Sequence, residues 1–264
     1  FLMCFFILSC KPHAVRKYRV IRDISLAKIQ VKKVMTIGIR DDLPPFTNRN
    51  KETDFLEGFD IDMARLVCNE MKVMADFKVI NWTNKEELLK HGDIDCIWSA
   101  YPVSQGTKSD FRMTKPYIRT CYVIGVKDHS NINSINDLDN KTLAMQTGSA
   151  TVTALEEMKR LKFRAIRDSY HRSFKFCIKE LDSGNVDGIV EDVLVINNLI
   201  KKEKKPYRCL DDVLSLESYC VAFRKNDISL ANRVQYILND LEYRDFTSPI
   251  SKKWFGSNIL IIGK

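Results

Sequence analysis

The feature that most constrains the fold is a short pattern that occurs twice, at residues 91–98 and 183–190. The two copies read HGDIDCIW and SGNVDGIV. Each copy follows a stretch of helical periodicity, stops it with Gly, and continues into an apolar run that is typical of a buried strand. Two such copies predict two similar α/β lobes, with strand ends that face each other across a cleft.

Small and polar residues come directly after the strand of the first copy. Ser99, Tyr101 and Ser104 follow the apolar run 94–98. In open α/β sheets, ligands bind just outside the carboxyl ends of the strands. We therefore expect a ligand site at this strand end.

The rest of the chain alternates predicted strands with predicted amphipathic helices. We expect Asp60 to be the N-cap of the helix that follows it, and Thr83-x-x-Glu86 to form a capping box for the helix that ends at Gly92. Strands are predicted at residues 34–39, 75–80, 120–126, 141–146, 186–190 and 218–223, and further helices around 152–158, 174–181 and 230–241. The third and the last of these strands are expected to connect the lobes.

The net charge of +8 lies almost entirely in the first 33 residues. That segment has eight Lys or Arg against one acidic residue, Asp23, so the other 231 residues are nearly neutral. This distribution argues against nucleic-acid binding by the folded body, which would need a basic face. With 264 residues, the chain can form one large domain or two lobes around a sizeable core.

Residues 1–10 form an apolar run of the length of a signal-peptide core, too short to span a bilayer as a helix. Ile7-Leu8-Ser9-Cys10 resembles a bacterial lipobox, in which Cys10 would be lipidated; the alternative is a plain signal or membrane-anchor segment. Residues 11–33 are predicted to be a basic linker, either attracted to an anionic membrane surface or simply solvated. Positive charge directly after an apolar segment favours cytoplasmic retention of that flank, which argues against the lipoprotein interpretation.

The cysteine and histidine spacings predict neither a metal site nor a redox motif. The eight Cys and four His form no CxxC pair, no HExxH motif and no Cys/His cluster. We expect no cofactor. Cys121 and Cys220 both fall in the predicted connecting strands, and a disulfide between them is one hypothesis.

Six segments, in this order, resemble the signatures of bacterial solute-binding proteins of the polar amino-acid type, which serve ABC importers. They read GFDIDMARLVCNEM, DIDCIWSAYPVS, DFRMTKPY, LAMQTGS, VDGIVED and KKWFG. The resemblance extends from about Val34 to Gly256. It implies an α/β, two-lobed, periplasmic-binding-protein-like (type II) fold, in which two α/β lobes are joined by two crossing strands around a ligand cleft.

The resemblance also implies a division of the chain. Lobe 1 is expected to comprise residues 34–120 and 217–257, and lobe 2 residues 121–216. The signal or lipoprotein segment 1–10 and the basic linker 11–33 come before lobe 1, and a tail, 258–264, comes after it.

By resemblance, Asp192 receives the ammonium group of an amino acid; otherwise it is a surface Asp after a strand. Trp82 matches a wall position, although a core Trp is an equal alternative. Ser99 and Tyr101 should border the pocket. The Gly148-Ser149 turn precedes a predicted helix, whose N–H groups and positive end suit a carboxylate, unless it is an ordinary N-cap.

Three positions depart from the family pattern. Thr107 stands where the family has an Arg that pairs with the carboxylate of the ligand, and Lys108 or Arg40 would have to replace it. Leu43 stands in place of a stacking aromatic residue, and Pro102 in place of a hydroxyl. The ligand is therefore expected to be a molecule other than a standard polar amino acid, or one that is bound differently; a degenerate paralogue with weak binding is the alternative.

The expected mechanism is hinge closure over the ligand, followed by docking on an ABC permease. The protein is expected to be a monomer without enzymatic activity, outside the cytoplasm, either lipid-anchored to the bacterial membrane or periplasmic. Two further alternatives stay open. One is an enzyme that resembles cyclohexadienyl dehydratases, with Glu191 or Asp192 as acid or base. The other is a sensor ectodomain, which would need a transmembrane helix after the fold.

Overall fold

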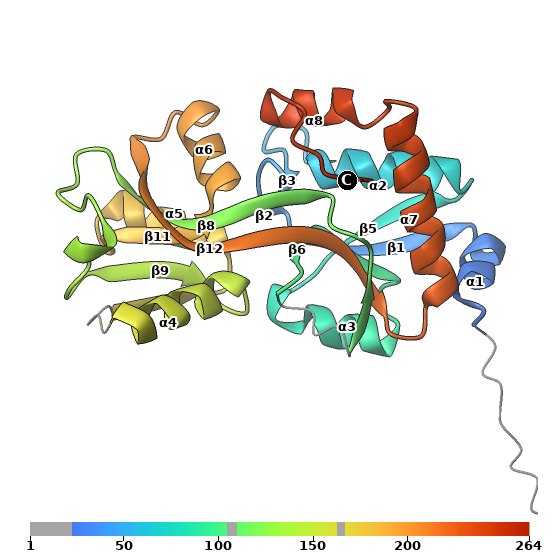
Figure 1. Cartoon of the computed structure of the whole chain (residues 1–264), viewed down its shortest axis with the longest axis horizontal. Helices are drawn as coiled ribbons and strands as arrows, with labels where there is room; N and C mark the ends of the chain where they lie inside the picture. The colour runs from blue at the N-terminus through green and yellow to red at the C-terminus, as the bar shows by residue number, and fades with distance from the viewer. Residues whose placement is uncertain (1–22, 105–109, 163–166, 264) are drawn as a thin grey trace, which may run out of the picture.

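The computed structural model describes residues 23–104, 110–162 and 167–263, which fold into two α/β lobes (Figure 1). Two long antiparallel strands, β8 (Ile118–Lys127) and β12 (Tyr207–Arg224), run side by side from one lobe to the other. In their ladder Thr120 is opposite Glu217, and Cys121 is opposite Leu216. The expected lobe boundaries therefore lie at matching points of the two connecting strands.

The strands form one sheet that continues through both lobes. Among the described residues its order is β10-β9-β11-β8-β12-β6-β1-β5, with β7 paired to β12. The strands not yet defined are β1 (Val34–Ile39), β5 (Met74–Val79), β6 (Cys96–Pro102), β7 (Phe111–Met113), β9 (Thr142–Gln146), β10 (Arg167–His171) and β11 (Gly188–Asp192). Each lobe contains a set of parallel strands. In lobe 1, β1 is parallel to β5 and β6, and in lobe 2, β9 is parallel to β10 and β11. A small second sheet contains β2 (Asp42–Leu43), β3 (Thr47–Arg49) and β4 (Leu56–Glu57).

The helices surround this sheet. They are α1 (Ser25–Lys32), α2 (Phe59–Glu70), α3 (Lys85–His91), α4 (Ala150–Lys162), α5 (Phe174–Ser183), α6 (Val193–Lys201), α7 (Ile228–Tyr243) and α8 (Ser248–Phe255), with 3-10 turns η1 (Trp82–Asn84) and η2 (Ile135–Asp137). In Figure 1, α3 and α4 lie on one side of the crossing strands and α6 and α8 on the other. The predicted apolar stripes are buried: Leu155 on α4 and Leu238 on α7 are examples.

The repeated sequence pattern has the same structure in both lobes. The helices α3 and α5 end at Gly92 and Gly184, which adopt left-handed conformations with φ of 88° and 74°. Each glycine N–H donates to a carbonyl of the last helical turn, which satisfies part of the helix end. Glycine is favoured there because a Cβ disfavours positive φ.

The Asp that both copies share has the same role twice. Asp95 accepts a hydrogen bond from the backbone N–H of Thr36, and Asp187 accepts one from Thr142, each at 2.8 Å. In return, the N–H groups of these two Asp residues donate to the carbonyls of the same threonines. The Asp therefore pins the incoming strand to the neighbouring parallel strand in each lobe, which explains why the pattern repeats.

The prediction that Asp60 is an N-cap is wrong. The N-cap of α2 is Gly58, with φ of 136°, where a Cβ would lie only 2.2 Å from the carbonyl oxygen of Phe46. Asp60 instead lies in the first turn, fully buried, and its Oδ2 accepts the N–H of Ala100 at 2.6 Å. Burial raises the pKa of Asp60 to about 7, against the opposing hydrogen bond from Ala100.

The predicted capping box at Thr83 is also wrong. Thr83 lies in η1, where its Oγ1 donates to Asn81 Oδ1 at 2.9 Å. The helix α3 begins after Asn84, which makes no side-chain cap. Glu86 instead accepts a hydrogen bond from the Tyr101 hydroxyl at 3.3 Å. Asn81 engages Thr83 because its side chain is the N-cap of η1 and accepts hydrogen bonds from both the N–H and the hydroxyl of Thr83.

The structure contradicts the hypothesis of a disulfide between Cys121 and Cys220, which are free thiols. Cys121 pairs with Leu216 on β12, and Cys220 lies four residues further along that strand. Four residues of strand span roughly 13 Å. A disulfide needs Cα atoms about 4.4–6.8 Å apart.

The expected linker and tail are partly folded. The helix α1 packs on α7, with Ile29 buried and the Ser25 hydroxyl 3.0 Å from that of Ser229. Near the other end, Leu260 bridges to Ile118 and is buried. The part of the expected linker from residue 23 onward and most of the expected tail therefore belong to lobe 1, because their apolar side chains extend its core.

Candidate functional site

Arg40 extends from the carboxyl end of β1 into the interface between the lobes, with only 5% of its side chain exposed. Its Nε donates to Asp42 Oδ1 at 2.9 Å. Its Cζ lies 5.7 Å from the ring centroid of Trp82, which favours a cation–π contact. Its Nη2 is buried and has no hydrogen-bond partner among the described residues.

Asp42 connects the two lobes directly. While Oδ1 accepts from Arg40, Oδ2 accepts the backbone N–H of Phe174, the first residue of α5, at 2.8 Å. Burial alone would raise the pKa of the Asp42 carboxyl, but the Arg40 charge and these hydrogen bonds outweigh burial and lower it. Asp42 is therefore an ionised group held by both lobes.

Lys85 makes a second contact between the lobes. Its side chain is 3% exposed, and Nζ donates to the carbonyl of Gly148 at 3.0 Å and to that of Trp82 at 3.2 Å. The same Nζ lies 3.1 Å from Glu86 and 4.9 Å from the centroid of the Trp82 ring. Gly148 has φ of 75°, and a Cβ built there would lie 3.2 Å from Thr83 Cα. The turn after β9 thus fits closely against η1.

A hollow of about 140 Å³ lies where these contacts meet. Its lining residues come from both lobes: Arg40, Asp41, Asp42, Ile80, Asn81, Trp82, Gln146, Arg172 and Ser173. Gln146, the last residue of β9, donates through Nε2 to the carbonyl of Arg172 at 3.1 Å. Its Oε1 is buried with no partner within the described ranges. The lining therefore includes an unused buried donor on Arg40 and an unused buried acceptor on Gln146.

The carboxyl end of β11 brings Glu191 into the same interface. Glu191 is 4% exposed; its Oε1 accepts the N–H of Asp192 at 3.0 Å, and its Oε2 has no partner in the described structure. Burial raises the pKa of Glu191 to about 7, although the Arg40 charge opposes this shift. Glu191 is thus a buried acid that titrates near neutrality.

Asp192, the predicted ammonium acceptor, is fully buried and does not line the hollow. It is the N-cap of α6, with Oδ1 accepting the Leu194 N–H at 2.6 Å, and Oδ2 accepts from the Tyr219 hydroxyl at 2.5 Å. Burial raises its pKa to about 6, and the hydrogen bond from Tyr219 opposes the shift. Each of its oxygens therefore already accepts one hydrogen bond.

The remaining predicted site residues support the hollow from behind or lie outside the described residues. Ser99 accepts the N–H of Arg40 at 3.2 Å, and Tyr101 packs edge-on against Trp82 at 6.4 Å between centroids. The Ser149 hydroxyl donates to the Gln146 carbonyl at 2.7 Å, within the turn. Thr107, Lys108 and the lipidation candidate Cys10 lie outside the described residues.

Sequence reasoning missed Lys85 and seven of the residues that line the hollow: Asp41, Asp42, Ile80, Asn81, Gln146, Arg172 and Ser173. Some of them carried a signal, because Asp41 and Asp42 lie in the loop after the first strand, and Ile80 and Gln146 each end a predicted strand. Lys85 reads as an exposed helical residue, and Arg172 follows a strand of weak periodicity. Their place at the interface depends on how the lobes meet.

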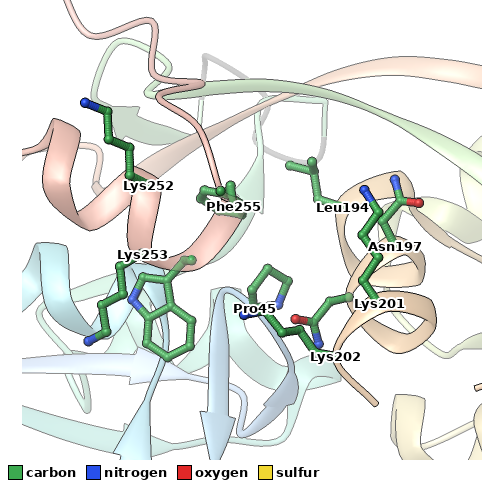
Figure 2. A pocket seen from close by; sticks show the side chains of 11 residues that line it. Pro45, Leu194, Asn197, Lys201, Lys202, Lys252, Lys253 and Phe255 are labelled. Atoms are coloured by element: carbon green, nitrogen blue, oxygen red, sulfur yellow. The ribbon is translucent and has the colours of Figure 1, made fainter. Parts of the chain in front are cut away.

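A larger groove, of about 380 Å³, lies between α6 and α8 and also has walls from both lobes (Figure 2). Lys201 and Lys202 extend from α6, and Lys252 and Lys253 from α8. All four are exposed, and Lys253 pairs with Asp62 at 2.7 Å. Lysines in the last turn of a helix also complement its negative end. The smaller hollow is the candidate solute site, because three of its polar lining residues, Arg40, Asp42 and Gln146, are buried and lie at or just after the ends of predicted strands.

The described residues contain neither a membrane-spanning helix nor a metal-binding cluster. Across residues 23–104, 110–162 and 167–263, no helix is long and apolar enough to cross a bilayer. Over the same ranges, no group of three or more His, Cys, Asp or Glu residues is arranged to hold a metal ion.

Comparison with known proteins identifies the family. Residues 35–257 match the model of the bacterial extracellular solute-binding proteins, family 3, so the chain belongs to this family. It is 26% identical over 231 residues to the probable amino-acid-binding protein YxeM of Bacillus subtilis (strain 168), and the match covers 86% of each protein.

Two solved structures are similar over almost their whole length. Tv2483 bound to L-arginine is 31% identical with a TM-score of 0.86, covering 92% of this chain and 99% of that one. An ABC uptake transporter substrate binding protein from Streptococcus pneumoniae with bound histidine is 26% identical with a TM-score of 0.85, covering 90% and 98%. The predicted two-lobed, type II periplasmic-binding-protein fold is confirmed.

Proposed function

We propose that this protein captures an α-amino acid, or a closely related small polar solute, between its lobes for an ABC importer. The observation that carries the proposal is the hollow at the end of β1, where Arg40 and Gln146, from opposite lobes, hold buried polar atoms without partners among the described residues. An unpaired buried donor or acceptor costs roughly 1–3 kcal/mol. A solute that pairs with both atoms removes this cost and so favours the closed form.

The solute's carboxylate is assigned to Arg40 and Arg172, which line the hollow from the two lobes. Arg40 is one of the two residues, with Lys108, expected to substitute for the family Arg that Thr107 replaces. A guanidinium offers a planar set of donors that matches a carboxylate. Trp82 forms one wall and stacks beneath the Arg40 guanidinium.

Asp192 is retained in the proposal as the acceptor for the solute's ammonium group. This role rests on the resemblance, because Asp192 does not line the hollow and its carboxylate already accepts hydrogen bonds from Leu194 and Tyr219. Ser99 and Tyr101 are assigned indirect roles, because they hold the Arg40 backbone and the Trp82 ring. Gly148 and Ser149 shape the turn that closes against η1.

Binding is assigned to hinge closure about β8 and β12, with lobe 1 at residues 34–120 and 217–257 and lobe 2 at 121–216. A solute shifts this equilibrium only by its difference in affinity for the two forms. The closed monomer is proposed to dock on a membrane permease outside the cytoplasm. Tethering through a lipidated Cys10 and a basic segment rests on the sequence alone.

A second candidate function is elimination chemistry of the cyclohexadienyl dehydratase kind. Glu191 favours it, because a buried carboxyl group with a pKa near 7 suits proton transfer. The binding function is preferred because the relatives that the chain resembles bind amino acids. Turnover of prephenate or arogenate by the purified protein would overturn this preference.

The test is a thermal-shift screen of the chain from Asp23 onward, which keeps α1 on α7, against amino acids, small peptides, polyamines and organic acids. A solute at a hundredfold excess over its dissociation constant should add about 2.7 kcal/mol. For a protein of this size, that is a rise of roughly 5–10 °C in melting temperature. Arg172→Ala should cut the rise to about half or less for any carboxylate-bearing solute, because losing a charged hydrogen bond weakens binding by about 10- to 150-fold. A screen without any rise contradicts the proposal.

A further inference from the structure

Asp42 caps a helix that belongs to the other lobe. The first N–H groups of a helix have no partner within it, and the helix end carries a partial positive charge. The residue that normally supplies the cap is Ser173, but its side chain makes no capping hydrogen bond to α5. The acceptor is Asp42, which lies 132 residues earlier in the chain and accepts the Phe174 N–H through Oδ2 at 2.8 Å.

The same carboxylate also orients Arg40. Oδ1 accepts Arg40 Nε at 2.9 Å, and both side chains are 5% exposed. With Nε engaged and Nη2 unpaired among the described residues, the guanidinium keeps a free edge. The Asp42 carboxylate therefore contacts lobe 2 through one oxygen and the solute-binding Arg40 through the other.

We propose that Asp42 is an intramolecular clasp that stabilises the closed form and, in closing, positions Arg40 for the solute. The inference rests on the proposed function in one respect, which is that the solute binds at Arg40. In the open form Asp42 keeps its bond to Arg40 but loses the one to Phe174, so the pair is held from one side only. In the closed form the Asp42 carboxylate is held by Arg40 and by Phe174, and this fixes the position of the Arg40 guanidinium.

The clasp acts before a solute arrives, since both of its partners belong to the chain. A charge-assisted hydrogen bond contributes enough to change an equilibrium by about 10- to 150-fold. Part of the closing free energy is therefore built into the protein, and the Lys85–Gly148 hydrogen bond adds to it. A binding-competent form that is already populated raises the apparent affinity for the solute.

The decisive measurement is amide hydrogen exchange of Phe174 by NMR, on the full chain without added solute. No carbonyl of α5 can protect this N–H, so protection reports the clasp. We expect at least tenfold protection over the intrinsic exchange rate, lost in Asp42→Ala and reduced in Asp42→Asn, which keeps an acceptor oxygen without the charge. The Arg40 Nε–H should lose protection in Asp42→Ala and keep part of it in Asp42→Asn; loss of closure alone would not remove this bond, because both residues belong to lobe 1.

A matched control is Asp62→Ala. Asp62 likewise accepts from a cation and from an N–H, Lys253 Nζ at 2.7 Å and Trp254 Nε1 at 2.8 Å, but within lobe 1. It should leave the exchange of Phe174 unchanged. Small-angle X-ray scattering should show a larger radius of gyration for Asp42→Ala and an unchanged one for Asp62→Ala.

Two outcomes would overturn the clasp. One is a Phe174 amide that exchanges at its intrinsic rate in the wild type; the other is equal protection in the wild type and both Asp42 variants. If Asp42→Ala does not fold, Asp42→Asn carries the comparison alone. Because no solute is present, failure here is separate from a failed solute screen, which would leave the clasp standing.

Discussion

The carboxyl ends of β1 and β11 are built alike and charged differently. Each follows an apolar strand and places two ionisable side chains in the interface, Arg40 with Asp42 in lobe 1 and Glu191 with Asp192 in lobe 2. All four are at most 5% exposed. The first end carries a cation and an anion in contact, whereas the second carries two acids.

This difference decides which groups are ionised. Asp42 has a lowered pKa because the charge and hydrogen bonds of its partners outweigh burial. Glu191 and Asp192 have pKa values raised to about 7 and about 6, because burial outweighs their hydrogen bonds. Similar burial thus gives opposite shifts, and a directly bonded cation is what reverses the sign.

The largest effect is expected from Arg40→Met, which leaves Asp42 buried without its cation. Removing one partner of a buried ion pair costs roughly 3–5 kcal/mol. Urea denaturation at pH 7.5 should show a loss of this order. The loss should be smaller at pH 5, where Glu191, with a pKa raised to about 7, is protonated and no longer needs the Arg40 charge.

Arg49→Met is the matched control for this prediction. Arg49 Nε pairs with Asp41 Oδ2 at 3.1 Å, with the Arg side chain 36% exposed and the Asp 29%. An exposed pair of this kind contributes about 0–1 kcal/mol. If Arg40→Met and Arg49→Met lower the free energy of unfolding equally, burial does not strengthen the Arg40–Asp42 pair.

The next effect concerns the acids of β11. The pKa of Glu191 rises from its ordinary value of 4.5, which applies to the unfolded chain, to about 7 in the folded protein. Between these values the folded state binds more protons, so the free energy of unfolding should fall as pH rises, by up to about 1.4 kcal/mol per pH unit. Glu191→Gln should reduce this dependence between about pH 4.5 and 7, while Asp60 and Asp192, whose pKa values are also raised, keep their own share of it. An unchanged slope in chemical denaturation would falsify the assignment.

The elements around both strand ends follow from local sequence. The apolar runs, the glycine stops and the shared Asp of the repeat act over a few residues, which is why β1, β6, β9 and β11 occur close to where periodicity places them. Trp82 and Arg40, expected at the site from the resemblance, do lie beside each other.

What the sequence could not predict depends on contacts between distant segments. The bond from Asp42 to Phe174 joins residues 132 positions apart, and nothing in the run Arg40 to Phe46 indicates it. Asp60 has the sequence signature of an N-cap, yet a buried hydrogen bond to Ala100 uses it instead. Tertiary packing overrides a local preference of about 1 kcal/mol whenever it offers a buried partner.

A smaller effect is expected from Tyr219→Phe, which keeps the ring on Phe46 and removes the hydroxyl that donates to Asp192. Leaving a buried acceptor unpaired costs roughly 1–3 kcal/mol. The hydrogen bond from Tyr219 lowers the pKa of Asp192, so the variant should raise that pKa further. The destabilisation should therefore be larger at pH 8, where Asp192 is ionised, than at pH 5. If the loss of stability does not depend on pH, Tyr219 does not act through its hydrogen bond to Asp192.

The smallest effect separates backbone strain from contact between the lobes. Gly148 and Gly184 have nearly equal φ, 75° and 74°, so Ala at either position should cost about 1 kcal/mol in the free energy of unfolding. A Cβ on Gly148 would lie 3.2 Å from Thr83 Cα in the other lobe, whereas one on Gly184 meets only Lys127 Nζ, at 3.9 Å. Gly148→Ala should therefore also enlarge the radius of gyration in small-angle scattering, and Gly184→Ala should not. Equal scattering from the two variants would mean that the fit of the turn after β9 against Thr83 does not limit closure.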